Sequence, residues 1–325
     1  MLILSDLHIG LKRRGGMSSE SMKAYREFQF ATIKGALQGH LHKHVLILGD
    51  LFDGFDVGYD DIWDVWTLLE PFKDRLILVA GNHDVSKNTD KLSALEFLRC
   101  LLGGCPGAIP WGGSGYEVIP HLPNQALFDK QIAATGEGSI LFTHCNYDNG
   151  FALEADHSLN LTPEQAARFS HVIIGHEHNK RDLPGIDIVG SLYPTSISDC
   201  KVDKGYHLWD GPGTELQFVP TWTTADYIEM DWRCLDPATP EHFIRVTGAA
   251  KPEEAAMVID LLTKFRKASS AFFITNSVKV GDIELGSIEA DAEQELDSFD
   301  PMKEFLGLLS GPYQLKIKEV EAGSK

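Results

Sequence analysis

Five short polar clusters in this chain carry side chains that bind divalent metal ions and transfer protons. Each cluster follows a run of three or four apolar residues. The clusters are Ser5-Asp6-Leu7-His8, Gly49-Asp50-Leu51-Phe52-Asp53-Gly54, Gly81-Asn82-His83-Asp84, Thr143-His144 and Gly175-His176-Glu177-His178. Their carboxylate, amide and imidazole donors suit two divalent transition-metal ions about 3.5–4 Å apart. The pattern therefore predicts a dinuclear metal site.

The expected metal ligands come from all five clusters. They are Asp6, His8, Asp50, Asn82, His144, His176 and His178. We expect Asp50 to bridge the two cations through its two carboxylate oxygens. An all-oxygen site would suit Mg, whereas this mixture of oxygen and nitrogen donors suits Mn, Fe or Zn.

Three further residues of the clusters are candidates for catalysis. A metal pair of this kind polarises a phosphoryl oxygen and holds a bridging hydroxide for in-line attack. His83 can protonate the leaving oxygen, and the Asp84 carboxylate is expected to orient and charge its ring. Asp53 is expected to hydrogen-bond ligand histidines through the ring nitrogen that does not bind the metal. These assignments predict phosphoester hydrolysis.

A basic segment follows the first cluster. Lys12, Arg13 and Arg14 lie on a Gly-rich loop beside the expected metals. Contact with a phosphate backbone is one interpretation of the segment, and an ordinary solvated loop is the other.

The elements that must position the clusters alternate between strands and helices over about the first 200 residues. Apolar runs bounded by Gly are typical of buried strands, and ligands gather beyond the carboxyl ends of such strands. The predicted helices cover residues 18–37, 60–70 and 92–101, with a short helix starting at the capping box of Thr162 and Gln165. Short strands at 186–189, 206–209 and 215–220 are expected to form a second sheet stacked on the first.

The remainder of the chain divides into a small module and a tail. After a passage over 226–236, the module is predicted to contain a strand (243–246), a helix (252–267) and a strand from 272. Residues 281–300 carry acidic side chains and no Lys or Arg, as a solvated linker would. Residues 301–309 form an amphipathic pattern that either packs on its own domain or docks on a partner. The expected domains are 1–225, 226–280 and 281–325.

The composition limits the possible classes of protein. The net charge of −18 argues against a surface coated with basic side chains, so contact with nucleic acid must rely on local basic elements, bound metal or a partner. The five cysteines follow no paired spacing, which favours a reduced, cytoplasmic protein. No apolar stretch approaches the roughly 20 residues of a membrane span. A strand at the N-terminus leaves no room for a signal peptide.

The order and spacing of the five clusters resemble the calcineurin-like metallophosphoesterases over roughly the first 200 residues. Ser5-Asp6-Leu7-His8-Ile9-Gly10, Gly49-Asp50-Leu51-Phe52-Asp53 and the segment Gly190–Ser196 are similar to the SbcD-type DNA repair nucleases, which include phage recombination nucleases. The resemblance implies an α/β fold with a two-sheet β-sandwich flanked by helices in four layers. It also implies a small C-terminal α/β module that caps DNA.

The same resemblance implies a division of the ligands and a set of partners. One metal would bind Asp6, His8, Asp50 and His178, and the other Asp50, Asn82, His144 and His176, with His83 as the catalytic histidine. The family implies Mn-dependent exonuclease and endonuclease action on DNA, a homodimer, and a coiled-coil ATPase of the SbcC type bound by the C-terminal region. The short C-terminal region and the acidic charge depart from this pattern.

Three functional hypotheses follow from these features. The first is a DNA nuclease subunit, which the C-terminal module and the amphipathic tail favour. The second is a phosphodiesterase or phosphatase for small molecules, nucleotides or phosphoproteins. The third is a non-catalytic scaffold, which the complete set of ligands disfavours.

Overall fold

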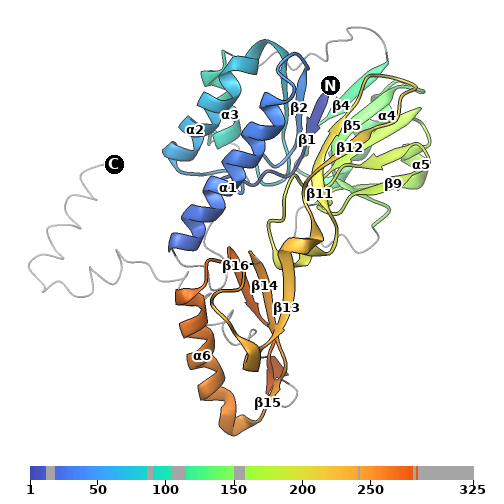
Figure 1. Ribbon diagram of the computed structural model, residues 1–325. Coiled ribbons are helices and arrows are strands. Elements are labelled where there is room, and N and C mark those ends of the chain that lie inside the picture. Colours follow the sequence, from blue (N-terminus) through green and yellow to red (C-terminus); the bar gives the residue numbers. More distant parts are fainter. Residues whose placement is uncertain are drawn as a thin grey trace, which may run out of the picture.

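The computed structural model describes residues 1–11, 19–85, 91–103, 115–149, 158–240, 242–280 and 283–284 (Figure 1). The predictions for Lys12, Arg13 and Arg14, and for the tail beyond residue 284, lie outside these residues. The described part contains two five-stranded sheets, flanking helices and a smaller unit with a sheet of its own.

The first sheet has the strand order β12-β11-β1-β2-β3. Its members are β1 (Leu2–Leu4), β2 (Val45–Leu48), β3 (Leu76–Val79), β11 (Lys204–Leu208) and β12 (Gln217–Trp222). β1, β2 and β3 are parallel and completely buried, as expected for apolar runs covered on both faces. β11 joins the free edge of β1 in the antiparallel direction.

The second sheet has the order β4-β5-β8-β10-β9. Its members are β4 (Tyr116–Ile119), β5 (Ile140–His144), β8 (His171–Gly175), β9 (Arg181–Leu183) and β10 (Ile186–Ile188). β4, β5, β8 and β10 are parallel, and β9 is an antiparallel edge strand. A short pair, β6 (Asn146–Tyr147) and β7 (Asn160–Leu161), forms a separate two-stranded sheet that packs on the core of the second sheet.

The two sheets face each other, and helices cover their outer faces. Between the sheets, Ile3 and Leu46 of the first pack in one buried cluster with Phe142 and Ile173 of the second. The outer face of the first sheet packs against α1 (Ser19–Gln38), α2 (Tyr59–Leu69) and α3 (Ala94–Leu101). The outer face of the second packs against α4 (Gln125–Ala134) and α5 (Pro163–Ala166). The predicted four-layer α/β fold is therefore confirmed.

The local signals in the sequence placed most of the helices. The predicted helices at 18–37, 60–70 and 92–101 correspond to α1, α2 and α3. The capping box of Thr162 and Gln165 is present, and it begins α5. We did not predict α4. The side chain of Asn124 caps its first turn, and the helix buries only Phe128 and Ile132.

One prediction about the sheets is wrong. Of the three segments assigned to the second sheet, only 186–189 lies there, as β10. The segments 206–209 and 215–220 fall in β11 and β12 of the first sheet, where Leu208 pairs with Leu2. The reason is that β1 would otherwise be an open edge, and an antiparallel return strand satisfies its backbone groups.

The unit after residue 226 has its own sheet and core. Parallel strands β13 (Tyr227–Asp231), β14 (Phe243–Thr247) and β16 (Phe273–Asn276) are covered by α6 (Ala255–Ala268). The short strands β15 (Ala249–Ala250), β17 (Lys279–Val280) and β18 (Ile283–Glu284) form a further sheet. We expected 226–236 to be a connection only, but it contains the edge strand β13, which is only partly buried and so lacks the fully apolar pattern.

An aromatic cluster joins this C-terminal module to the main body, below which it lies in Figure 1. Tyr25 of α1 contacts Phe272 and Phe273, with ring centroids 5.6 Å and 5.0 Å apart. Phe243 and Trp222 belong to the same buried cluster. Edge-to-face pairs of this kind stabilise an interface beyond the area that they bury.

None of the described helices combines the length and the apolar composition that crossing a bilayer requires.

Candidate metal centre

The five clusters meet where the two sheets meet. β1, β2 and β3 bring three of them from the first sheet, and β5 and β8 bring the other two from the second. Main-chain hydrogen bonds join the loops after β1 and β2: Asp6 N–H donates to the Gly49 carbonyl at 3.2 Å, and His8 N–H donates to the Asp50 carbonyl at 3.0 Å. The ligand-bearing loops are therefore part of the folded scaffold.

Four of the expected ligands have unusual backbone conformations. Asp6, His8, Asp50 and His176 have φ values of 54°, 43°, 49° and 94°. Residues other than glycine seldom adopt positive φ, and such strain concentrates at functional sites. Here it turns the chain sharply after each strand, so that the side chain reaches the common centre.

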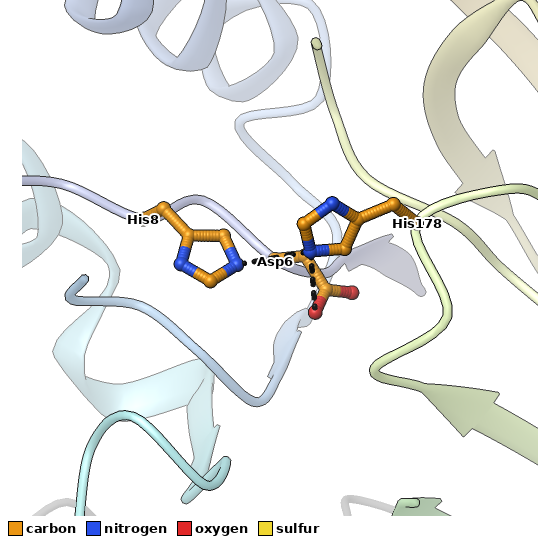
Figure 2. A group of neighbouring side chains, drawn as sticks. All are labelled: Asp6, His8 and His178. Carbon is orange, nitrogen blue, oxygen red and sulfur yellow. Dashed lines mark hydrogen bonds and ion pairs between the residues drawn. The ribbon is translucent and has the colours of Figure 1, made fainter. Parts of the chain in front are cut away.

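The first ligand group consists of Asp6, His8 and His178, whose donor atoms lie within 4.8 Å of one another. Figure 2 shows the His178 ring nitrogen turned toward both of the other residues. The Nε2 atoms of His8 and His178 are 3.1 Å apart, and His178 Nε2 lies 3.9 Å from Asp6 Oδ1. Two ring nitrogens that face each other beside a carboxylate are arranged as donors to a shared cation.

The Asp6 carboxylate supplies a test of whether a metal ion fits. Its Oδ2 accepts hydrogen bonds from Ser5 Oγ at 2.6 Å and from His176 N–H at 3.2 Å. Its Oδ1 is buried and has no hydrogen-bond partner among the described residues. A buried carboxylate oxygen without a partner is costly unless a cation binds it. The first ligand group therefore fits a divalent ion.

The second ligand group consists of Asp50, Asn82, His144 and His176. Asn82 Oδ1 lies 3.2 Å from His144 Nε2 and 3.0 Å from His176 Nδ1. His144 Nε2 lies 3.3 Å from Asp50 Oδ2. The three ionisable members form a second cluster within 4.8 Å, and an amide oxygen beside them completes a mixed oxygen and nitrogen donor set.

Asp50 connects the two groups through one oxygen atom. Its Oδ2 lies 3.8 Å from His8 Nε2 and 3.3 Å from His144 Nε2. Its Oδ1 accepts a hydrogen bond from His83 N–H at 2.9 Å. We expected the two oxygens to divide between two cations; the ring nitrogens of both groups lie near Oδ2, and Oδ1 accepts a main-chain hydrogen bond.

Three of the expected ligand histidines make a contact through the ring nitrogen that faces away from the centre. His144 Nδ1–H donates to the Leu48 carbonyl at 2.9 Å, so Nε2 is the nitrogen that is free for a metal when the ring is neutral. His8 Nδ1 lies 3.1 Å from Asp53 Oδ1, the contact expected of Asp53. His178 Nδ1 lies 3.1 Å from Asp199 Oδ2. Such contacts select the tautomer and the orientation of a ligand histidine.

His83 lies next to the first ligand group and is only partly buried. Its ring contacts the His8 ring edge-on, with centroids 4.8 Å apart. Nδ1–H donates to the main-chain carbonyl of Asp53 at 2.8 Å. Because a carbonyl only accepts, Nδ1 keeps its proton, and Nε2 is the atom that can exchange a proton with a substrate. A ring nitrogen of His83 also lies within 4.8 Å of donor atoms of His8 and Asp50.

Asp84 occupies a different place from the one we expected. Its hydrogen bonds come from main-chain N–H groups: Gly81 at 2.9 Å, Phe52 at 3.0 Å and Leu51 at 3.3 Å. Among the described contacts, the partner of the His83 ring nitrogen is Asp53, through its carbonyl. Asp84 is buried, and these three hydrogen bonds tie the loop after β2 to the loop after β3.

Burial and charge act in opposite directions on the central side chains. Burial lowers the pKa of His144, but the adjacent Asp50 carboxylate outweighs it and raises the pKa to about 9. Burial raises the pKa of Asp50, but His144 and His8 bring it far below its usual range. Burial and the neighbouring His144 lower the pKa of His176 to about 4. Burial and the Asp50 charge raise the pKa of Asp84 to about 7.

A second set of polar residues surrounds the centre, and our sequence analysis missed it. Asp199, Thr195 and Lys204 are buried beside His178. Lys204 Nζ donates to the His178 carbonyl at 2.6 Å and to Asn179 Oδ1 at 2.8 Å. No pattern marks them, although Thr195 falls in the segment Gly190–Ser196 that resembled the SbcD-type nucleases.

Comparisons with known proteins bear on the same region. The family model for calcineurin-like phosphoesterases matches residues 1–180, more than half of the 325-residue chain. The matched residues contain all seven members of the two ligand groups and His83. Comparison with curated proteins finds no match. The match and the paired groups of metal-binding side chains agree, and the chain belongs to the calcineurin-like phosphoesterases, a family of metal-dependent hydrolases.

Proposed function

We propose that this phosphoesterase is a DNA nuclease, with both exonuclease and endonuclease action, and the nuclease subunit of a recombination or repair complex. The observation that carries the proposal is the position of the C-terminal module, which packs against the segments that hold the metal ligands. Leu11, Ile197 and Cys200, which flank ligand-bearing or ligand-supporting residues, share one buried cluster with Phe243 and Phe273 of the module. A long substrate at the centre would therefore have this module as a neighbour.

Two tyrosines connect the module interface with the ligand loops. Tyr193 Oη donates to the carbonyl of Leu7, which lies between Asp6 and His8, at 2.6 Å. Tyr25 Oη donates to the carbonyl of Pro194 at 2.7 Å. Tyr25 also contacts the module through Phe273. An enzyme for small phosphoesters has less need of an attached module that is tied to its active-site loops.

The residues of the chain have distinct roles in this reaction. Asp6, His8, Asp50 and His178 would hold one divalent ion, and Asp50, Asn82, His144 and His176 the other. We propose Mn²⁺, with Fe, Zn and Mg as alternatives. When bound, the ions supply Lewis-acid activation of the phosphate and a nucleophile at neutral pH.

His83 would donate a proton, and Asp53 would orient a ligand ring. His83 would give a proton from Nε2 to the leaving oxygen while its Nδ1–H remains bonded to the Asp53 carbonyl. The Asp53 carboxylate would hold the His8 ring as a ligand. Lys12, Arg13 and Arg14 are proposed to contact the phosphate backbone of DNA.

We also propose that the chain acts as a homodimer with a coiled-coil ATPase of the SbcC type, bound by the tail beyond residue 284. The net charge of −18 supports the need for a partner, because an acidic chain repels the DNA backbone. The same charge favours a second candidate, a phosphodiesterase or phosphatase for small molecules or nucleotides.

One experiment separates the two candidates. The purified chain with Mn²⁺ is given linear duplex DNA, single-stranded DNA, and chromogenic phosphate monoesters and diesters. The nuclease proposal predicts DNA cleavage that the Asp50→Asn variant, purified in the same way, lacks. Turnover of small diesters with intact DNA would contradict it. An Asp187→Asn variant, changed away from the ligand clusters, serves as the matched active control.

A further inference from the structure

A buried carboxylate beyond the family-matched residues contacts the first ligand group. Asp199 lies in the short 3-10 helix Ile197–Lys201 and is 6% exposed. Its Oδ2 lies 3.1 Å from His178 Nδ1, and it accepts hydrogen bonds from Thr195 N–H at 3.0 Å and Thr195 Oγ1 at 2.9 Å. The family match ends at residue 180, so it assigns Asp199 no role.

The contact determines which nitrogen of His178 faces the metal centre. A carboxylate oxygen that already accepts two hydrogen bonds favours the tautomer with a proton on Nδ1 of His178. That tautomer leaves the lone pair of Nε2 directed toward His8 Nε2, at 3.1 Å, and Asp6 Oδ1, at 3.9 Å (Figure 2). The His178 ring therefore contacts Asp199 through one nitrogen and faces the rest of the first ligand group through the other.

The main chain of His178 is held by a different group. Lys204 Nζ donates to the His178 carbonyl, and Ser191 N–H donates to the same oxygen at 3.0 Å. These bonds do not involve the imidazole ring. Loss of the Asp199 carboxylate would therefore leave the ring nitrogen Nδ1 with only the Thr195 hydroxyl, whose Oγ1 lies 3.2 Å away, while the backbone of His178 stays in place.

We propose that Asp199 is a positioning residue that holds His178 as a ligand of the first ligand group. The proposal rests on the two-metal function proposed above. Contacts that orient a metal-binding histidine are typically worth about 10–100-fold in metal affinity. The effect is expected at one ion only, because the rings of the second ligand group have other supports, such as the Leu48 carbonyl for His144.

The chain offers a matched control in a second pair of histidine and carboxylate. His171 Nε2 contacts Asp187 Oδ2 at 2.5 Å, at the start of β8, whereas His176 and His178 follow the end of that strand. His171 is not a member of either ligand group. Asp187→Asn therefore removes the same kind of charge from a histidine that does not face the centre.

The experiment titrates the full metal-free chain with Mn²⁺ by calorimetry. The wild type and Asp187→Asn are each expected to bind two ions, and each ion should have the same affinity for both proteins. Asp199→Ala is expected to retain one ion at wild-type affinity and to bind the other about 10–100-fold more weakly. Asp199→Asn, whose amide oxygen can still accept from Nδ1–H, is expected to recover part of that loss.

A second readout distinguishes positioning from simple support of the loop. Nitrogen-15 NMR of the metal-free protein, recorded where the imidazole is neutral, should show the Nδ1–H tautomer of His178 in the wild type and a mixture in Asp199→Ala. Thr195→Val removes one hydrogen bond to Asp199 and the 3.2 Å contact of the hydroxyl with His178 Nδ1, but it leaves the carboxylate beside the ring, so two-ion binding should persist.

The outcomes separate the two proposals. If the wild type fails to bind two ions, the proposed function is wrong. If the wild type binds two ions and Asp199→Ala does so with unchanged affinity, the role of Asp199 is wrong. Equal weakening of both ions in Asp199→Ala, with a lowered melting temperature and an unchanged tautomer, would also overturn it.

Discussion

The two ligand groups of the metal centre are supported in different ways. In the second group, His144 has a completely buried side chain, and its ring is held by the main-chain carbonyl of Leu48. In the first group, the side chain of His178 is 26% exposed, and His8 and His178 contact the carboxylates of Asp53 and Asp199. The main chain of β2, to which Leu48 belongs, therefore supports His144 of the second group, whereas individual side chains support His8 and His178 of the first.

This difference has a consequence for how each half can be altered. A main-chain carbonyl remains whatever the residue at that position, so the support of His144 is lost only when the strand moves. A carboxylate support disappears with one substitution. The second ligand group should therefore respond to packing changes, and the first to changes of single polar residues.

The largest expected effect comes from the residue that both groups share. Asp50→Asn removes the charge of the oxygen that lies between His8 and His144, so both ions should be lost or bound weakly. We expect phosphodiester hydrolysis to fall at least about 1000-fold, about 4 kcal/mol of transition-state stabilisation. The measurement is kcat/KM with metal content by elemental analysis.

Asp182→Asn, at an exposed carboxylate, is the control for this substitution. Retention of one ion at full affinity in Asp50→Asn would show that the two groups do not share this residue.

The next effect separates proton transfer from metal binding. His83→Ala removes the proposed acid and is expected to lower kcat about 100- to 1000-fold while two ions remain bound. A chromogenic diester with a good leaving group, which needs little protonation, should lose much less activity. Loss of an ion from His83→Ala would instead make His83 a ligand together with His8 and Asp50, whose donor atoms lie nearby.

A packing change should act more strongly on the second ligand group than on the first. Gly49 has φ +88°, and a Cβ added there would overlap the His144 ring. Gly49→Ala should therefore displace His144 and weaken the ion of the second group by at least about tenfold, with a smaller effect on the ion of the first group, since Gly49 adjoins Asp50 and accepts a bond from Asp6 N–H. Calorimetric titration with Mn²⁺ measures both affinities.

Gly138 provides the matched control, because it has φ +76° with open space around its Cβ position. Gly138→Ala should cost about 1–2 kcal/mol of stability through backbone strain and change neither affinity. If both substitutions weakened metal binding equally, strain and not displacement of His144 would be the cause.

The mildest intervention, a change of pH without any substitution, should also act on the second ligand group. His144 in the metal-free protein has a pKa raised to about 9, because Asp50 outweighs burial, so it is protonated at pH 7 and must lose that proton to bind metal. Affinity should rise about tenfold per pH unit between pH 7 and 9 and then level off. His176, with a pKa lowered to about 4, releases no proton in this range.

Calorimetry in buffers of different ionisation enthalpy measures the proton released. The raised pKa also stabilises the metal-free fold below about pH 6.5, and this contribution is lost as the pH rises through about 9. Uptake of protons on metal binding at pH 7 would contradict the assignment.

Much of the fold followed from local patterns. The apolar runs at β1, β2, β3, β5 and β8 were recognisable because parallel strands covered on both faces must be apolar throughout. The capping box of Thr162 and Gln165 located the start of α5 in the same way. β11 was assigned to the wrong sheet because its partner β1 is remote in sequence, and the edge strand β13 was missed because it is only partly buried.

The ligand types were determined by the sequence alone. Asp, Asn and His after successive strands define a mixed donor set wherever the strands run parallel, because the carboxyl ends of such strands lie at the same edge. The tertiary structure decided the surroundings of each member: Asp50 Oδ2 lies near ring nitrogens of both His8 and His144, Asp84 accepts hydrogen bonds from main-chain N–H groups, and Asp199 contacts His178. The physical reason is that a hydrogen bond depends on direction and distance between groups, such as His144 and Leu48, that are far apart in the chain and meet only on folding.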